Sequence, residues 1–192
     1  MIRSLSDVAH IQSGHPFRGS VPLVSGGNAY ALQMRDISLD DGVAWSGLVQ
    51  TQIDGRKTPE WLQPGDVVFV ARGTHNFAVS LQEVPRPAVC SQYFFLLRVK
   101  PSSGLLPDFL AWQINGAPAQ RYLASNAEGS DQLSIRRGVL EGLPIAVPPI
   151  AQQRLVIALS NKAIEEKKLL ESLIRNRQRQ LDALAHELHI AQ

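Results

Sequence analysis

The sequence predicts an α+β fold, in which a globular mixed α/β domain over residues 1–148 precedes one long helix over residues 149–192. Runs rich in β-branched and aromatic residues lie mostly before residue 100, whereas helical patterns lie after it. Neither Gly nor Pro follows Pro149, so nothing interrupts a helix in the last quarter of the chain. From Gln152 to Leu188 that helix would be about 55 Å long. A domain of this size does not need such a helix to complete its own core, so we expect a partner to pack against it.

The first sixty residues are expected to form short strands joined by turns. A helical turn around Asp7 leads into a strand through Ile11. Further short strands are expected at residues 21–24 and 30–34, and residues 36–58 are interpreted as exposed polar loops around one or two strands.

The next strands give a sharper signal. The turn Leu62-Gln63-Pro64-Gly65-Asp66 leads into residues 67–71, which are apolar on both faces, as is typical of a buried strand. Residues 77–81 are expected to return as a strand, and residues 88–99 are interpreted as one longer strand because they are dense in β-forming residues.

Helices are expected in the rest of the domain. A helix is expected to start at residues 107–114, because Pro107 lies near its first turn and Asp108 just inside it, and both residue types favour a helix start. A second helix is expected at residues 118–123, a helical turn at 136–141, and a last strand at 143–147 before the long helix.

The composition is that of an ordinary globular protein, with 44% hydrophobic and 19% charged residues. Up to Pro149 there are 12 Lys and Arg against 12 Asp and Glu, and the remainder holds 7 against 5, which gives the net charge of +2. Bulk charge therefore does not indicate a nucleic-acid partner, and any such partner must be argued from local clusters.

The sequence also limits the compartment. It has no run of about 18 apolar residues that would cross a membrane, and its first residues lack the apolar core of a signal peptide. Its single cysteine, Cys90, cannot form an internal disulfide. These features together predict a cytoplasmic protein.

Catalytic motifs are missing from the sequence. It has no Gly-x-Gly-x-x-Gly, and Pro148-Pro149 lies between Val147 and Ile150, so it is not the Asn/Asp-Pro-Pro-aromatic motif of methyltransferases. His186 and His189 lie one turn apart, but no further Cys or His nearby completes a metal site, so an exposed helix face is the better interpretation. We expect no catalytic residue, no metal and no cofactor.

Several short motifs follow one another in a characteristic order. They are Leu5-Ser6-Asp7-Val8-Ala9, Leu62-Gln63-Pro64-Gly65-Asp66, Leu106-Pro107-Asp108-Phe109-Leu110, Gln132-Leu133-Ser134, and the run from Leu143 to Gln153 that ends in Pro148-Pro149-Ile150-Ala151-Gln152-Gln153. Each motif is weak alone, but their order and spacing ahead of a long helix resemble the specificity subunit of Type I restriction-modification systems.

The resemblance implies a division of labour between the two parts of the chain. Residues 1–148 would be a target-recognition domain that binds double-stranded DNA, and residues 149–192 a conserved helix that forms a coiled coil and docks methyltransferase subunits. The family is not catalytic: methylation belongs to methyltransferase subunits and cleavage to motor-nuclease subunits. The family's usual subunit carries two such units, whereas this sequence carries one, so it resembles a half subunit or a fragment.

Candidate DNA-contacting residues lie in the loops, where side chains with paired donors and acceptors are clustered. The candidates are Arg35, Gln50, Gln52, Arg56, Lys57, Arg72, Thr74, His75, Asn76, Gln92, Tyr93, Ser130, Gln132, Ser134, Arg136 and Arg137. The stretches 72–76 and 130–137 are favoured because they flank buried elements that would hold them rigid. The alternative is that these residues are the ordinary polar residues of solvent-exposed loops.

A heptad pattern along the helix predicts a seam for a second helix. Counting in sevens and in the companion 3-4 series gives the seam residues Leu170, Ile174, Arg177, Leu181, Leu184 and Leu188. We expect an antiparallel coiled coil, in which Arg177 either reaches out past its neighbours or meets an acid of the partner such as Glu171. The alternative is a single helix that lies back on the chain's own domain.

A symmetric dimer through this seam would put two globular domains at opposite ends of the helix pair. The target would then be an interrupted palindrome with two inverted half-sites. Other interpretations stay open: a fragment of a two-domain subunit with an asymmetric target, a coiled-coil scaffold that binds only protein, and an enzyme with an unrecognised site.

Overall fold

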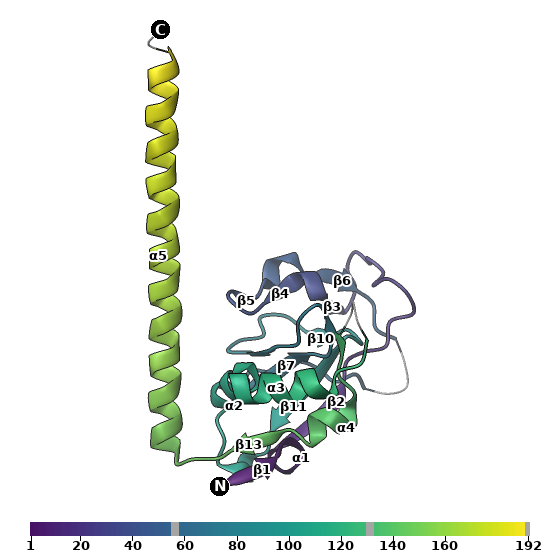
Figure 1. The fold of residues 1–192 in the computed structure, drawn as a ribbon. Coiled ribbons are helices and arrows are strands. Elements are labelled where there is room, and N and C mark those ends of the chain that lie inside the picture. Colours follow the sequence, from purple (N-terminus) through teal and green to yellow (C-terminus); the bar gives the residue numbers. More distant parts are fainter. Residues whose placement is uncertain (55–57, 130–132, 191–192) are drawn as a thin grey trace. The chain divides into compact units, whose positions relative to one another are not determined.

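The computed structural model describes residues 1–54, 58–129 and 133–190. The chain divides into two compact units, Met1–Arg154 and Leu155–Gln192, and each is described by itself. The first unit mixes short strands and helices, and the helix α5 (Ile150–Ile190) continues from it into the second (Figure 1). This confirms the predicted α+β class with a long C-terminal helix, whereas the pairing of that helix stays a prediction.

A four-stranded antiparallel sheet forms the centre of the first unit. Its order is β2 (Ala9–Ser13), β11 (Phe94–Val99), β7 (Asp66–Val70) and β9 (Ala78–Ser80). All of β7 is buried, as its apolar residues on both faces predict. Leu96 lies opposite Val68 across the β11–β7 ladder, and both side chains are fully buried in the core.

A smaller sheet has the order β10 (Ala88–Cys90), β3 (Ala29–Leu32) and β6 (Val49–Thr51). The prediction of one strand over residues 88–99 is therefore wrong, because β10 and β11 lie in different sheets. A turn separates them: the Ser91 amide donates to Leu32 O at 3.0 Å, and the Phe94 amide donates back to Ser91 O at 3.1 Å. Gln92 and Tyr93 thus lie at the tip of a turn and are exposed.

The predicted strand at residues 21–24 is also wrong, since none of these residues joins a ladder. Pro22 has no amide hydrogen to donate, and the Val24 amide makes one isolated hydrogen bond to Gln50 O at 2.9 Å. The remaining strands and short helices are β1 (Ile2–Ser4), α1 (Leu5–Val8), η1 (Met34–Asp36), β4 (Ile37–Ser38), β5 (Gly42–Val43), η2 (Trp45–Gly47), β8 (Arg72–Gly73), η3 (Pro101–Ser103), β12 (Leu133–Ser134) and β13 (Pro144–Ala146).

The predicted helices are confirmed as α2 (Pro107–Asn115), α3 (Ala117–Asn126) and α4 (Arg137–Glu141). Pro occupies the first turn of both α2 and α3. The α2 helix buries Phe109, Leu110 and Ile114, and its last residue, Asn115, exchanges two 2.8 Å side-chain hydrogen bonds with the backbone of Ala78 in β9. The helix is therefore held against the edge of the central sheet.

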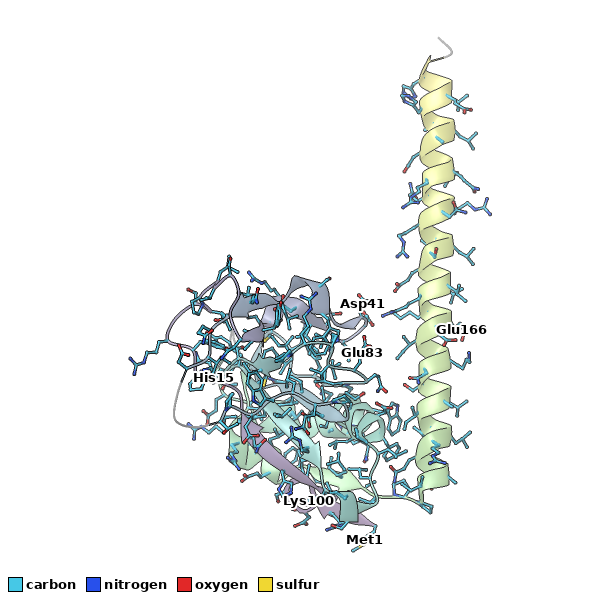
Figure 2. All side chains as sticks on the ribbon, turned by 180° about the vertical axis from the view of Figure 1, so that it is seen from behind. Met1, His15, Asp41, Glu83, Lys100 and Glu166 are labelled. Atoms are coloured by element: carbon cyan, nitrogen blue, oxygen red, sulfur yellow. The ribbon has the colours of Figure 1, made fainter. Side chains whose placement is uncertain are left out.

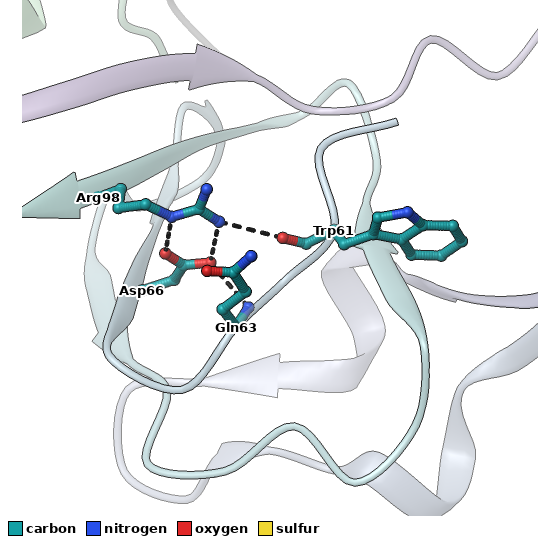
Figure 3. Close-up of polar contacts among 4 residues, drawn as sticks. All are labelled: Trp61, Gln63, Asp66 and Arg98. Atoms are coloured by element: carbon teal, nitrogen blue, oxygen red, sulfur yellow. Dashed lines mark hydrogen bonds and ion pairs between the residues drawn. The ribbon is translucent and has the colours of Figure 1, made fainter. Parts of the chain in front are cut away.

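An ion pair explains the turn that precedes β7 (Figure 3). Asp66 is buried, and its two carboxylate oxygens accept from Arg98 Nε and Nη2 at 2.8 and 2.9 Å. Asp66 also accepts from the Gln63 amide at 2.8 Å, and Arg98 donates to Trp61 O at 3.1 Å. The hydrogen bonds to Asp66 raise the pKa of the Arg98 guanidinium above its usual range. One buried carboxylate thus ties the turn to strand β11.

The two ends of the first unit meet. Strand β1 pairs antiparallel with β13, and the Leu5 amide donates to Leu143 O at 2.9 Å. Gln153 in the first turns of α5 is fully buried: its Oε1 accepts from the Leu106 amide at 2.9 Å, and its Nε2 donates to Gly104 O and Pro148 O at 2.7 and 2.8 Å. The Gln-Gln motif thus attaches the start of α5 to the globular unit.

Two further features concern single residues and helix composition. Cys90 is buried, and burial raises the pKa of its thiol to about 12, so the thiol is neutral at physiological pH. In the part of the chain that the structure describes, no helix is long and apolar enough to cross a membrane.

Candidate nucleic-acid interface

The structure joins the two loop stretches that the sequence favoured. Strands β8 and β12 pair antiparallel, with Arg72 opposite Ser134 and Gly73 opposite Leu133. The Ile135 amide extends this ladder by donating to Ala71 O at 2.9 Å. Because Ala71 follows the buried strand β7, the central sheet holds the ladder in place. Residues 60 positions apart in the sequence therefore share one small, supported surface.

The turn between β10 and β11 lies against the same ladder. Tyr93 O accepts from the amides of Ala71 and Arg72 at 2.9 and 3.3 Å. The side chain of Tyr93 is left 43% exposed, and Gln92 beside it is exposed as well. Both are therefore available next to Arg72, which is exposed too.

A cavity of about 460 Å³ connects Arg35 to this turn. Its lining includes Phe17, Gln33, Met34, Arg35, Gln92 and Tyr93. Met34 also reaches the ladder, since a Cβ added at Gly73 would lie 3.0 Å from Met34 Cε. A side chain at position 73 would crowd the end of Met34, and the φ of +157° at Gly73 is a backbone conformation that other residues rarely adopt. The Arg72 face is the name used below for the residues Arg35, Arg72, Gln92, Tyr93, Ser134 and Arg136.

The cations of the Arg72 face differ in their surroundings. Arg136 pairs with Glu128 at 2.8 Å, and the Glu128 backbone exchanges hydrogen bonds of 3.0 and 2.8 Å with Ser134. Arg35 lies 3.7 Å from the Asp36 carboxylate. Among the described residues, no ion pair engages Arg72. Arg72 is therefore the cation of this face whose charge has no carboxylate neighbour within the described part of the chain.

An aromatic contact lies beside the cavity. His15 and the lining residue Phe17 make an edge-to-face ring contact with centroids 4.7 Å apart, and burial lowers the pKa of His15 below its usual value. The sequence did not indicate four residues of this site: the cavity-lining Phe17, Gln33 and Met34, and Glu128, which pairs with Arg136. Their part in the site depends on contacts with residues that are distant in the chain.

Other predicted residues lie away from the Arg72 face. Gln50 Nε2 donates to Gly27 O at 2.9 Å. Gln52 accepts from the Asn28 amide at 3.2 Å and donates to Asp54 at 2.8 Å. Both side chains thus hydrogen-bond to the turn at residues 27–28, which precedes β3, the strand that pairs with β6.

The loop after β8 divides its predicted residues. Thr74 is exposed, whereas His75 and Asn76 line a second cavity with Asn115 and Gln120. Asn76 is only 7% exposed and donates to Val70 O at 3.0 Å. We therefore correct the expectation for Asn76: its amide closes the turn after β7 and faces the protein interior.

Arg137 is oriented differently from its neighbour Arg136. It pairs with Glu141 along α4 at 2.7 Å and lines a polar cavity with His10 and Lys100. Figure 2 shows Lys100 apart from His15, whose ring contacts Phe17 in the lining of the first cavity. The predicted residues Arg56, Lys57, Ser130 and Gln132 lie outside the described residues.

The predicted seam residues all lie on α5, and their apolar side chains are 52–72% exposed. Arg177 is exposed beside them. Side chains project from α5 all around its axis (Figure 2). Within the described ranges, no group of three His, Cys, Asp or Glu could hold a metal ion.

Comparison with known proteins was informative only at the level of structure. No family model matches the sequence. No curated protein sequence matches it significantly either.

Several solved structures match this chain, and the three described here cover 87–98% of it. The S subunit of a Type I restriction-modification system from M. genitalium is 15% identical, with a TM-score of 0.57, over 98% of this chain and 45% of that one. The HsdS subunit from Thermoanaerobacter tengcongensis is 18% identical, with a TM-score of 0.57, over 87% of this chain and 37% of that one.

The third structure comes from work on complex assembly and conformational transition of the type I R-M system. It is 16% identical, with a TM-score of 0.68, over 96% of this chain and 43% of that one. The chain thus spans less than half the length of each structure that it matches. The resemblance predicted from the motifs is confirmed for the fold: this chain has the fold of the specificity subunits of Type I restriction-modification systems.

Proposed function

We propose that this chain is a non-catalytic DNA sequence-recognition subunit of a Type I restriction-modification system. The observation that supports this most directly is the β8–β12 ladder, which joins the two polar stretches into one rigid surface on the fold of a specificity subunit. Base recognition needs side chains held in place by supported backbone, because a misplaced donor loses its hydrogen bond.

The Arg72 face supplies complementary chemistry for duplex DNA. Arg72 offers the two donors that match the acceptors of guanine, and Gln92 offers the donor and acceptor that match adenine. Arg35 and Arg136 suit phosphates, since each is exposed and carries charge that its acidic neighbour screens only in part. Tyr93 adds an aromatic ring that is 43% exposed.

The helix α5 supplies the assembly part of the proposal. We assign its exposed apolar seam to a second copy of the chain, which makes this chain a half subunit that reads an interrupted palindromic site. The pair of helices would dock methyltransferase subunits, with or without a motor-nuclease subunit. Methylation and cleavage would then take place in those partners, with no catalytic residue or cofactor in this chain.

A second candidate is favoured by one observation, the coverage of less than half of each similar structure. The chain would then be one recognition unit of a longer specificity subunit whose second unit differs. In that case the seam would pair with a helix of the same polypeptide, and the target would be asymmetric.

The DNA-binding proposal is tested by selecting binding sites from random duplexes, followed by gel shift at several salt concentrations. We expect one preferred sequence and an affinity that falls steeply with salt, as phosphate contacts require. Arg72→Ala should weaken binding to the preferred site by ~1–3 kcal/mol and relax the preference at one position. The matched control is Arg121→Ala, an exposed arginine on α3. No sequence preference, or an equal effect of both substitutions, would contradict the proposed role of Arg72.

A further inference from the structure

Two charges lie inside the apolar stripe of α5, and they have opposite signs. At about 100° per residue, only Glu166 and Arg177 among the charged residues after Arg154 fall within roughly 40° of Leu170 around the axis. The same sector holds Leu159, Leu184 and Leu188, which are 63%, 56% and 72% exposed. Figure 2 labels Glu166 about half-way along the helix, with its side chain projecting from the surface.

A parallel pair of these helices would be electrostatically unfavourable. In register, it would bring Glu166 beside Glu166 and Arg177 beside Arg177, and like charges in a desolvated seam repel each other. An antiparallel pair removes this conflict. In such a pair, residue i of one helix faces residue j of the other when i + j equals a constant, so Glu166 need not face Glu166 and Arg177 need not face Arg177. The stripe therefore favours the antiparallel direction before any particular register is chosen.

The charges also select one register. We propose that a second copy of this chain packs antiparallel along α5 with Glu166 of each copy beside Arg177 of the other. This inference rests on the helix pairing in the proposed function and deepens it, because it names the contacts that fix the alignment.

The apolar residues fit the same alignment without further adjustment. It places Leu170 opposite Leu173, Leu159 opposite Leu184, and Leu155 opposite Leu188. All six are more than half exposed in the single chain. Lys162 falls opposite Leu181 at the edge of the stripe, where its long aliphatic stem can cover the leucine while the ammonium stays in water.

The register expected from Arg177 and Glu171 fits less well. It would place Leu188 opposite Ser160 and Leu170 opposite Gln178. Glu171 also lies about 100° from Leu170 around the axis, and it already has Lys167 and Arg175 of its own helix at 3.9 and 4.0 Å. Glu166 is therefore the better partner for Arg177.

The register converts the helix into a spacer of defined length. The two-fold axis would pass between Glu171 and Ser172, so the buried Gln153 anchors of the two copies would lie 37 residues apart along the pair, or about 55 Å. That distance corresponds to roughly 16 base pairs of B-DNA at ~3.4 Å each.

Charge exchange in the full chain tests the contact, with the dimer dissociation constant measured by analytical ultracentrifugation. Glu166→Lys and Arg177→Glu alone should each weaken the dimer by about tenfold or more, and the double variant should recover most of the loss. The matched controls are Glu165→Lys and Arg179→Glu, which lie on the opposite face of α5 and should change the constant by less than about twofold. Failure of the double variant to recover would overturn the register.

Cysteine cross-linking tests the same register by distance. Mixed chains carrying Leu159→Cys and Leu184→Cys should form an interchain disulfide, whereas neither variant should cross-link with itself. Cys90 does not interfere, since it is buried. Self-cross-linking of Ile174→Cys in place of the Leu159→Cys and Leu184→Cys pair would instead support the Glu171 register and overturn ours, because that register places Ile174 of one copy opposite Ile174 of the other. A chain that stays monomeric also overturns the inference, while a specific gel shift by that monomer would leave the proposed DNA recognition standing.

Discussion

The leucines of the two units differ in their exposure to solvent. In the unit Met1–Arg154, Leu96, Leu110 and Leu140 are fully buried among strands and helices. In α5, Leu173 and Leu188 are 64% and 72% exposed. Each leucine that stays in water forgoes about 1.5–3 kcal/mol of hydrophobic stabilisation. The first unit therefore completes its core within itself, whereas the helix taken by itself keeps a stripe of exposed leucines.

Polar groups show the same contrast. Asp66 and Gln153 are buried, and each is satisfied by several hydrogen bonds, most of them to distant parts of the chain. The ion pairs of α5, such as Lys162 with Glu165, connect neighbouring turns at an exposed surface. Exposed pairs contribute about 0–1 kcal/mol, whereas breaking a buried pair costs about 3–5 kcal/mol. Specific interior contacts thus stabilise the first unit, and local contacts support the second.

Arg98→Met should have the largest effect on the first unit. It keeps the aliphatic bulk but leaves the buried Asp66 carboxylate without its cation, so we expect the free energy of unfolding to fall by ~3–5 kcal/mol. Urea unfolding followed by tryptophan fluorescence measures this, because all three tryptophans lie before Arg154. Arg137→Met is the control: its pair with Glu141 is exposed, so the loss should stay below about 1 kcal/mol. Equal losses in the two variants would remove the distinction between interior and surface pairs.

Gln153→Ala should have the next largest effect. It leaves the Leu106 amide and the carbonyls of Gly104 and Pro148 without their partner, so we expect a loss of about 1–3 kcal/mol. Hydrogen exchange at the Leu106 amide should accelerate together with the loss of stability. Gln152→Ala is the neighbouring exposed control and should change stability by no more than ~0.5 kcal/mol. An unchanged exchange rate at Leu106 would show that Gln153 does not hold this attachment.

Leu184→Gln should have the smallest effect on the first unit and sharpens the comparison most. Because Leu184 is 56% exposed in the single chain, the unfolding of the globular unit should change by less than ~0.5 kcal/mol. Self-association should weaken at the same time, since a polar amide would enter the proposed seam. A clear loss of tryptophan-detected stability in the monomer would mean that α5 contributes to the globular core.

The parts of the fold that sequence reasoning predicted well depend on local chemistry. The buried strand after Leu62-Gln63-Pro64-Gly65-Asp66, the proline-initiated helices and the uninterrupted α5 follow from residues adjacent in the chain. Its errors have one cause as well. Residues 88–99 contain enough β-forming residues for a single strand. The Ser91 amide instead donates to the Leu32 carbonyl, and the chain then turns, so that β10 and β11 join different sheets.

The candidate site divides in the same way. The sequence showed which loops carry paired donors and acceptors, but not that β8 and β12 place Arg72 opposite Ser134. It also gave no sign that Asn76 turns inward to Val70, while Tyr93 remains exposed at a turn. Polar residue type is visible in a sequence, whereas the direction of a side chain depends on its backbone partners.

The sequence by itself determined the class of the fold, the order of its motifs and the length of α5, because propensity, turn chemistry and periodicity act over a few residues. The tertiary structure alone decided which strands share a sheet, which partners bind the buried side chains of Asp66 and Gln153, and which loops form the Arg72 face. Those outcomes depend on hydrogen bonds and packing between residues 30 or more positions apart, such as Asp66 with Arg98 and Leu106 with Gln153. No local pattern encodes such contacts.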